Sequence, residues 1–326
     1  MTTEPEMGGA AGSGMIGREI GQSLFEIRRQ FNALVEPHRS DLWRYCLYLA
    51  GSAWDAEDLV QETLLKAFAR LSTLFQPVAV KPYLFRIASN AWIDAKRRAT
   101  GVDEVLDDDF AAEEPPVEAD PIATRAAIER MVTVLPPRQR VVCLLADVFD
   151  LSMTEIARIL GVTPGAAKAM LSRARVALKG REALSAGPAN LARIDPAPND
   201  ALVLSYLDAF NRRDLDALIA LLQPEAVSDI LGVFVEYRRE TIKSGSLGAW
   251  ARDTKEQWAR AGTLEGRPVF FVFVRQPTGE EALGWLVELG FVGGEIGAIR
   301  DYFYCADFVR FAAAALGVAA LPNEPF

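Results

Sequence analysis

The stretch "EIARILGVTPGAAKAMLSRARVALKG", residues 155–180, has the pattern of two short helices joined by a tight turn. Ser152 can cap the first helix, and the acid three residues later suits a capping box. Gly161 supplies the left-handed conformation that commonly ends a helix. Thr163 can cap the second helix, with Pro164 in the first helical position, where its missing N–H is harmless. The sequence therefore predicts a helix-turn-helix.

The second helix of this pair has two chemically different faces. Helical spacing predicts an inward apolar face formed by Ala167, Met170, Leu171, Ala174 and Leu178. Small residues beside long cations on the other side would let the helix enter the DNA major groove, where cations meet phosphates and base edges. A solvated basic face on an ordinary helical hairpin is the alternative. The candidate DNA contacts on this helix are Thr163, Lys168, Ser172, Arg173, Arg175 and Lys179.

Charge is unevenly distributed along the chain, whose formal net charge is −9 over 326 residues. Residues 101–121 carry nine acids and no base, whereas residues 122–184 carry ten bases and five acids. The block around the helix-turn-helix is therefore locally basic, as a DNA-binding unit requires. The acidic run is by default a solvated spacer.

The length of the chain exceeds that of one ordinary core, so we expect two or three domains. Helical periodicity covers two blocks, and strand-like runs such as "RPVFFVFVRQ" come after residue 200. We predict two all-α domains followed by an α+β domain. The predicted limits are 1–22 for a disordered tail, 23–100 for the first helical domain, 101–121 for an acidic linker, 122–184 for the second helical domain, 185–199 for a connector and 200–326 for the α+β domain.

Two motifs stand out in the first helical block. In "DAEDLVQETLLKAFARL", residues 55–71, an exposed leucine ringed by carboxylates and an amide suits a protein partner with basic helices. A plain solvated acidic face is the alternative. In "PYLFRIASNAWIDAKRR", residues 82–98, aromatic and cationic side chains of the kind that hold unstacked bases lie close together. We expect Phe85 and Trp92, rather than Tyr83, to belong to the core.

Together these motifs resemble conserved regions of bacterial sigma factors, and the compact layout is similar to the extracytoplasmic-function group. The block around the helix-turn-helix resembles the fourth sigma region, which binds the minus-35 promoter element. The motif at 55–71 resembles the segment that grips the clamp helices of core RNA polymerase. The motif at 82–98 resembles the segment that reads and melts the minus-ten element.

The resemblance implies roles for particular residues. It implies polymerase contacts at Asp55, Asp58, Gln61, Glu62 and Leu65. It implies promoter contacts in the first block at Tyr83, Arg86, Asn90, Lys96, Arg97 and Arg98. It also implies that the loop "FQPVAVK", residues 75–81, captures a flipped promoter base, and that the acidic linker threads the cationic channels of polymerase.

The C-terminal third resembles SnoaL-like cone domains, a fold of polyketide cyclases, steroid isomerases and non-catalytic binding proteins. The resemblance rests on the order of a helix pair, a strand, a helix and a curved run of strands. In such a fold a carboxylate in an apolar pocket can do general acid/base work, for which Asp229 and Asp301 with Tyr237 and Tyr302 are the candidates. Arg300 beside Asp301 equally suggests a structural ion pair. We expect a regulatory domain without catalytic residues.

Composition argues against several other chemistries. Cys46, Cys143 and Cys305 are far apart in apolar sequence, which predicts three buried thiols. His38 is the only histidine, so His-rich metal sites are excluded. Neither a signal peptide nor a membrane-length apolar run is present, so we expect a cytoplasmic protein without a membrane partner. We expect no cofactor and no metal.

The leading hypothesis is a sigma factor without enzymatic activity, with core RNA polymerase and promoter DNA as partners. Its C-terminal domain would modulate that activity, with an anti-sigma factor or a small ligand left open as a further partner. The alternative is a helix-turn-helix transcriptional regulator with a ligand-sensing or enzymatic cone-fold domain.

Overall fold

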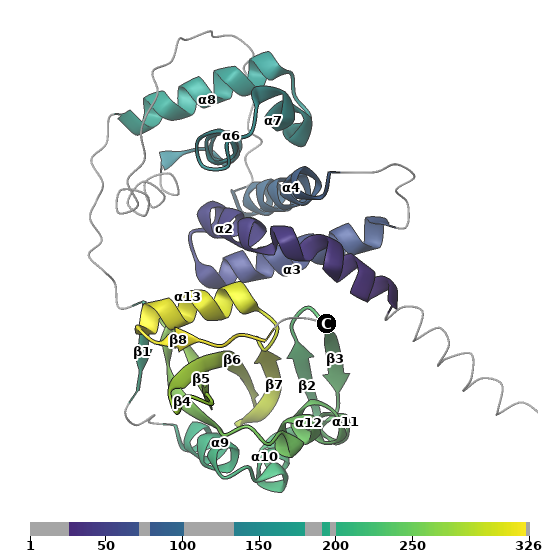
Figure 1. The fold of residues 1–326 in the computed structure, drawn as a ribbon, viewed down its shortest axis with the longest axis vertical. Coiled ribbons are helices and arrows are strands. Elements are labelled where there is room, and N and C mark those ends of the chain that lie inside the picture. The colour runs from purple at the N-terminus through teal and green to yellow at the C-terminus, as the bar shows by residue number, and fades with distance from the viewer. Residues whose placement is uncertain (1–25, 72–78, 101–133, 180–190, 196–199, 324–326) are drawn as a thin grey trace, which may run out of the picture.

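The computed structural model describes residues 26–71, 79–100, 134–179, 191–195 and 200–323. Two helical domains and one α+β domain follow each other along the long axis of the molecule (Figure 1). The fold class predicted from the sequence is therefore confirmed. The predicted tail at 1–22 and the acidic linker at 101–121 lie outside the described residues, as do most of the loop at 75–81 and much of the connector at 185–199.

The first helical domain packs its helices around an aromatic and aliphatic core. Helical residues 26–35 and a short 3-10 turn, η1 (Glu36–His38), lead into three longer helices. These are α2 (Arg39–Ala50), α3 (Ala53–Leu71) and α4 (Val80–Thr100). Phe85 and Trp92 are buried and Tyr83 is half-buried, in agreement with the prediction for α4.

The second helical domain has the local structure that its capping residues predict. Its helices are α6 (Pro137–Asp147), α7 (Met153–Leu160) and α8 (Pro164–Lys179). Ser152 and Glu155 form a reciprocal capping box at the start of α7, and Gly161 ends that helix with φ of 69°. The Oγ1 of Thr163 accepts a hydrogen bond from the Ala166 N–H at 3.1 Å, so Thr163 caps α8. The inward face of α8 is buried as expected, with Ala167, Met170, Leu171 and Ala174 in the core.

The α+β domain is built on one curved sheet, whose strands run in the order β1-β4-β5-β6-β7-β2-β3, with β8 paired to β6. The neighbours are antiparallel except for β2 with β7 and β6 with β8. Register shifts in β5–β6 and β6–β7 bend the sheet around its concave side. The strands are β1 (Ala192–Ile194), β2 (Leu222–Ile230), β3 (Phe234–Tyr237), β4 (Gln257–Leu264), β5 (Arg267–Arg275), β6 (Glu281–Val292), β7 (Glu295–Asp301) and β8 (Ala319–Ala320).

Helices close the two ends of this sheet. Asp200 and Asp214 cap α9 (Ala201–Asn211) and α10 (Leu215–Ala220), so the predicted helix pair is confirmed. These helices lie with α11 (Arg239–Ser244) and α12 (Ser246–Arg252) at the end of the sheet farthest from the helical domains (Figure 1). The last helix, α13 (Ala306–Leu316), lies between the sheet and the first helical domain (Figure 1).

The α+β domain begins earlier than the sequence predicted. Residues 192–194, assigned to the connector at 185–199, form the edge strand β1 and pair with β4 in antiparallel register. Gly262 on β4 makes this approach possible, because a Cβ at that position would collide with the carbonyl of Arg193. The sequence does not predict a strand in "ARI" because three residues are too short to show strand alternation.

The two helical domains are packed against each other, with α4 on α6 and α7, and Phe149 and Arg140 make specific side-chain contacts between them. Phe149, which follows α6, contacts the rings of Tyr45 and Phe85 edge-on at centroid distances of 5.5 and 5.0 Å. The buried Arg140 of α6 donates a hydrogen bond to the Leu49 carbonyl at 2.9 Å. Its guanidinium also lies over the Trp92 ring. A single apolar cluster consequently runs through all three domains.

Replacing Phe149 with alanine should loosen the contact between the helical domains. Loss of a buried phenylalanine typically costs about 3–5 kcal/mol, and here much of that contact crosses the domain boundary. We expect a larger radius of gyration by small-angle X-ray scattering, with helix content unchanged by circular dichroism. Val148→Ala, at an exposed neighbouring position, is the control. An unchanged radius for Phe149→Ala would contradict this role.

Candidate nucleic-acid and protein interfaces

The helix-turn-helix presents part of its predicted DNA-binding face to solvent. Thr163 and Lys168 are exposed, and Ser172 and Arg173 are half-buried on the same helix. Lys179 ends α8, and the placement of its side chain is not described. The N-terminal half of α8 is thus the accessible part of this face, which is the half that a recognition helix directs toward base edges.

Arg175 is engaged within its own domain. Its Nη2 lies 2.5 Å from the Oδ1 of Asp147 at the end of α6, and both side chains are about one-third exposed. Helical spacing alone placed Arg175 with Lys168 on an outward face. The spacing could not show that α6 brings a carboxylate to this position, because Asp147 is 28 residues earlier in the chain.

On α4 the predicted promoter-binding residues form an exposed stripe that runs to the end of the helix. Arg86 and Asn90 are exposed on successive turns, followed by three exposed cations, Lys96, Arg97 and Arg98. Arg97 pairs with Asp94 at 3.2 Å on the helix surface. Elsewhere on its surface α4 packs on α2 and α3 of its own domain and on α6 and α7 of the second helical domain. Tyr83 differs from the others because its hydroxyl oxygen is buried and lacks a hydrogen-bond partner among the described residues.

The predicted polymerase-binding residues lie together on one side of α3. Asp55, Asp58 and Leu65 are exposed and Gln61 and Glu62 are half-buried, with Leu65 the most exposed at 70%. Behind them, Val60, Leu64 and Ala67 are buried in the core of the domain, as helical spacing predicts. The structure therefore brings all five residues onto the expected face.

The α+β domain covers the N-terminal half of that face. Arg300 of β7 donates a hydrogen bond to the Asp58 carboxylate at 2.8 Å, and Arg267 of β5 lies 3.8 Å from the carboxylate of Asp55. Gly232, in the β2–β3 turn, packs so closely on Gln61 that a Cβ there would collide with the amide. Three of the five predicted polymerase contacts thus meet the C-terminal domain, whereas no contact with that domain is recorded for Glu62 and Leu65 in the described residues.

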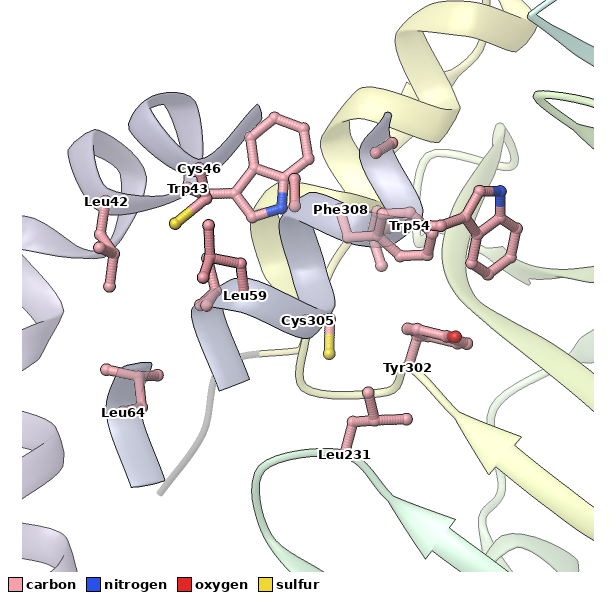
Figure 2. Packing of buried hydrophobic residues seen from close by; sticks show 14 of the residues in the cluster. Leu42, Trp43, Cys46, Trp54, Leu59, Leu64, Leu231, Tyr302, Cys305 and Phe308 are labelled. Atoms are coloured by element: carbon pink, nitrogen blue, oxygen red, sulfur yellow. The ribbon is translucent and has the colours of Figure 1, made fainter. Parts of the chain in front are cut away.

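Trp54 anchors this contact. Its ring is 2% exposed and packs edge-on against Tyr302 and Phe308, at centroid distances of 5.4 and 4.9 Å. Its indole N–H donates to the Leu264 carbonyl at 2.9 Å. Figure 2 shows the tryptophan beside Phe308 and above Tyr302, where the helices of the first domain meet the sheet. Burying a tryptophan ring removes about 150–250 Å² from water, equivalent to an upper limit of roughly 4–6 kcal/mol.

The flanking ion pairs contribute less than the tryptophan. The side chains of Arg300 and Asp58 are 35% and 50% exposed, and exposed pairs are typically worth about 0–1 kcal/mol. Glu265 adds a different interaction, since its carboxylate accepts hydrogen bonds from the Ala53 N–H at 2.8 Å and from Ser52 at 3.1 Å. A residue of the β4–β5 turn therefore caps the N-terminus of α3, where a negative charge is favourable.

A buried carboxylate lies beside this interface. Glu57 accepts hydrogen bonds from the Trp43 indole at 3.0 Å and from Gln61 at 2.6 Å, and the Gln61 amide also approaches the sulfur of Cys305. Burial raises the pKa of Glu57, while these hydrogen bonds act in the opposite direction. Cys305 is one of three buried free thiols, as predicted from the sequence. The pKa of its thiol is raised well above the usual range by the same burial.

Sequence reasoning did not assign Trp54, Glu265 or Arg267 to this interface. A tryptophan at the start of an amphipathic helix and a charged residue before a glycine turn are compatible with many folds. The sequence suggests an ion pair between Arg300 and its neighbour Asp301, and the structure corrects this. Along a strand adjacent side chains point to opposite faces, so Arg300 reaches Asp58 and Glu288 while Asp301 faces the other way.

The four candidate catalytic residues of the α+β domain do not form one site. Asp301 borders an apolar cavity of about 290 Å³ on the concave side of the sheet. Tyr302 faces Trp54, Tyr237 is 66% exposed, and Asp229 lies near Arg300 and Asp58. Burial raises the pKa of Asp301 to about 7, although its Oδ1 accepts the Phe303 N–H at 2.8 Å. Only one of the candidates is therefore available to a ligand in this cavity.

Within the described residues, no cluster of three or more Cys, Asp, Glu or His side chains is arranged to hold a metal ion. The described helices also include none with the apolar length needed to cross a membrane.

Comparison with known proteins identifies the family to which the two helical domains belong. The chain matches the families Sigma-70 region 2 over residues 34–101 and Sigma-70, region 4 over residues 125–178. The ECF RNA polymerase sigma factor SigG of Mycobacterium tuberculosis is 31% identical in an alignment 229 residues long, which covers 62% of this chain and 61% of SigG. SigL of the same species is 33% identical in an alignment 153 residues long, which covers 45% of this chain and 85% of SigL. The chain belongs to the ECF RNA polymerase sigma factors.

The match to SigG spans about three-fifths of that relative's length. Among solved structures, the crystal structure of the M. tuberculosis extracytoplasmic function sigma factor SigJ is 22% identical. That likeness covers 84% of this chain and 95% of SigJ, with a TM-score of 0.31.

The raised pKa of Asp301 predicts a pH dependence of stability. A carboxyl whose pKa rises from 3.8 to about 7 on folding stabilises the fold when protonated. This contribution is fully present below about pH 4 and is lost as the pH rises through 7, with an upper limit of about 4 kcal/mol. Glu236 also faces this carboxyl, and its charge raises the pKa of Asp301 further. The phenols of Tyr206 and Tyr304 lie near enough to interact electrostatically with Asp301.

We expect Asp301→Asn to remove most of this dependence, measured by denaturant unfolding at pH values from 4.5 to 7.5. Asp195→Asn, on a carboxylate paired with Arg193 away from the cavity, is the control and should keep the wild-type profile. Parallel profiles for wild type and Asp301→Asn would contradict the assignment.

Proposed function

We propose that this protein binds core RNA polymerase and directs promoter-specific initiation, and that its C-terminal domain modulates polymerase binding by covering α3. The regulatory part of the proposal is supported by three contacts between the C-terminal domain and α3. Arg300 meets Asp58, Arg267 meets Asp55, and Gly232 packs on Gln61. We infer no catalytic activity for the chain and a cytoplasmic site of action.

The covered face is the one that resembles the polymerase-gripping segment of sigma factors. Polymerase would have to compete with two arginines, a tight glycine turn and the buried Trp54 for the first three turns of α3. A binding-competent state populated only in a minor fraction lowers the apparent affinity by that fraction. The C-terminal domain would therefore act in place of, or in addition to, a separate anti-sigma factor.

The packing of the two helical domains supports a second restraint. The minus-ten and minus-35 elements are separated by about 25 base pairs, or roughly 85 Å of duplex at 3.4 Å per base pair. Arg140 of α6 and Phe149, which follows α6, contact Trp92 and Phe85 of α4, and these contacts hold the two helical domains against each other. Binding to polymerase would separate them, so free protein should bind promoter DNA weakly.

The promoter-reading role can be tested at Lys168, the exposed cation on the accessible half of α8. We expect Lys168→Ala to lower transcription from the cognate promoter and to reduce the salt slope of promoter binding by about one, with core affinity unchanged. The promoter is first identified by mapping start sites made in vitro with core enzyme. Lys243→Ala removes the same charge from the α+β domain and should have no effect. Equal losses of core affinity and transcription for Lys168→Ala would refute this division of roles.

The regulatory role is better tested from the C-terminal side of the interface than from α3. A change at Asp58 removes both the proposed polymerase contact and the restraint, so its two effects oppose each other. Arg267→Ala combined with Arg300→Ala removes the restraint alone. We expect core affinity to rise about three- to tenfold, because two partly exposed ion pairs together contribute about 1 kcal/mol.

Binding is measured with purified core enzyme by fluorescence anisotropy of the labelled protein. Arg275→Ala is the matched control, since this arginine pairs with Glu256 on the same domain. Unchanged or weaker core binding by the double variant would overturn the regulatory part of the proposal. Failure of the wild-type protein to co-purify with core polymerase would instead favour a helix-turn-helix regulator that acts without it.

A further inference from the structure

The cavity of about 290 Å³ in the α+β domain has a lining that restricts what it can bind. Its walls come from α9, α12 and the inner face of the sheet, and they are mostly aromatic and aliphatic. They include Tyr206, Phe210, Trp250, Trp285, Val287, Ile299 and Phe303. Among the described residues that line it there is no lysine, arginine or histidine, so no cation of this lining would neutralise an anionic ligand. An apolar ligand with a flat ring fits this lining.

Two polar groups in the lining call for a hydrogen-bond acceptor. The indole Nε1 of Trp250 is buried and has no hydrogen-bond partner among the described residues, and an indole N–H can only donate. Asp301 also borders the cavity, with its Oδ1 held by the Phe303 N–H. The remaining carboxylate of the lining, Asp253, already accepts bonds from Lys255 and Gln257. A cationic amine would leave the Trp250 donor unsatisfied.

The protonation of Asp301 agrees with the same kind of ligand. With a pKa near 7 the carboxyl is largely neutral in mildly acidic solution and can donate to an acceptor oxygen. The acidic groups that face it are Glu236 of β3, Asp253 beyond α12, and the phenols of Tyr206 and Tyr304. These groups add no positive charge that would favour the ionised carboxylate.

The strand that carries Asp301 also carries the contacts to α3. Ile299 and Asp301 face the cavity, whereas Arg300 and Tyr302 point to the opposite face and meet Asp58 and Trp54. The Tyr302 N–H continues the ladder to Leu286 at 3.0 Å, so this segment is held as extended chain. A shift of Asp301 toward a ligand would therefore move its two neighbours at the interface.

We propose that this cavity binds a neutral aromatic molecule with a carbonyl oxygen, held by Trp250 and Asp301, and that its occupancy changes the contact of residues 300–302 with α3. The binding step rests on the cavity alone. Its consequence for transcription rests on the proposed function.

The test uses 6-propionyl-2-dimethylaminonaphthalene, a neutral aromatic ketone whose emission shifts to the blue in apolar surroundings. Titration into the full-length protein at pH 6 should give a saturable blue shift. Trp250→Phe should weaken binding roughly three- to tenfold, the amount expected for one hydrogen bond. Trp258→Phe, in the same domain but outside this lining, is the matched control and should leave binding unchanged.

The contribution of Asp301 is measured by the pH dependence of ketone binding. Wild-type binding should weaken as the pH rises from 6 to 8, because the ionised carboxylate can no longer donate. Asp301→Asn keeps a donor amide and should bind the ketone equally at both pH values. The absence of saturable binding by the wild type, a Trp250→Phe variant that binds as well as the wild type, or tighter binding of 2-(aminomethyl)naphthalene would overturn the assigned ligand class.

The link to α3 is measured on the same protein without polymerase, by amide hydrogen exchange of residues 53–61. We expect exchange there to change by at least twofold when the ketone is bound, with exchange in α8 unchanged. Bound ketone with unaltered exchange at 53–61 would overturn the link. Because polymerase is absent from both measurements, their failure is distinct from a failure of the proposed function.

Discussion

The burial of Trp54 in the C-terminal domain is the contact on which the arrangement of the molecule depends. The ring lies at the first turn of α3, and its N–H reaches a carbonyl at the end of β4. Because a buried tryptophan exceeds an exposed ion pair several-fold in free energy, it fixes where α3 meets the sheet. The ion pairs of Asp55 with Arg267 and of Asp58 with Arg300 then align opposite charges across that contact. The same turn of α3 receives its N-terminal cap from Glu265.

This contact explains how an acidic domain can cover an acidic helix face. The C-terminal domain presents Arg267 and Arg300 at the surface that meets α3, whatever its overall charge. The basic faces of α4 and α8 are on other sides of the helical domains and are not covered by it. The local distribution of charge, and not the net charge of −9, therefore decides which surfaces of this protein meet one another.

The position of β7 joins an interior cavity to an exterior interface. A strand directs alternate side chains to opposite faces, so three consecutive residues serve two surfaces with one rigid segment of backbone. Asp301 is turned inward, where burial raises its pKa, and Arg300 and Tyr302 are turned toward α3. A change at the cavity can therefore reach the contact with α3 through this segment alone, provided that the segment has two arrangements of similar energy.

Local features of the sequence determined the helices, their caps and the two helical domains. Ser152, Gly161 and Thr163 act within a few residues of their own position, so their patterns could be interpreted without the fold. The outward residues of α3 followed from helical periodicity in the same way, whereas the promoter contacts on α4 were implied by the resemblance to sigma factors. Only the tertiary structure showed that Asp147 meets Arg175, that β1 extends the sheet, and that Arg300 pairs with Asp58. Each of these contacts joins residues 28 or more positions apart, and periodicity contains no information about which distant surfaces will meet.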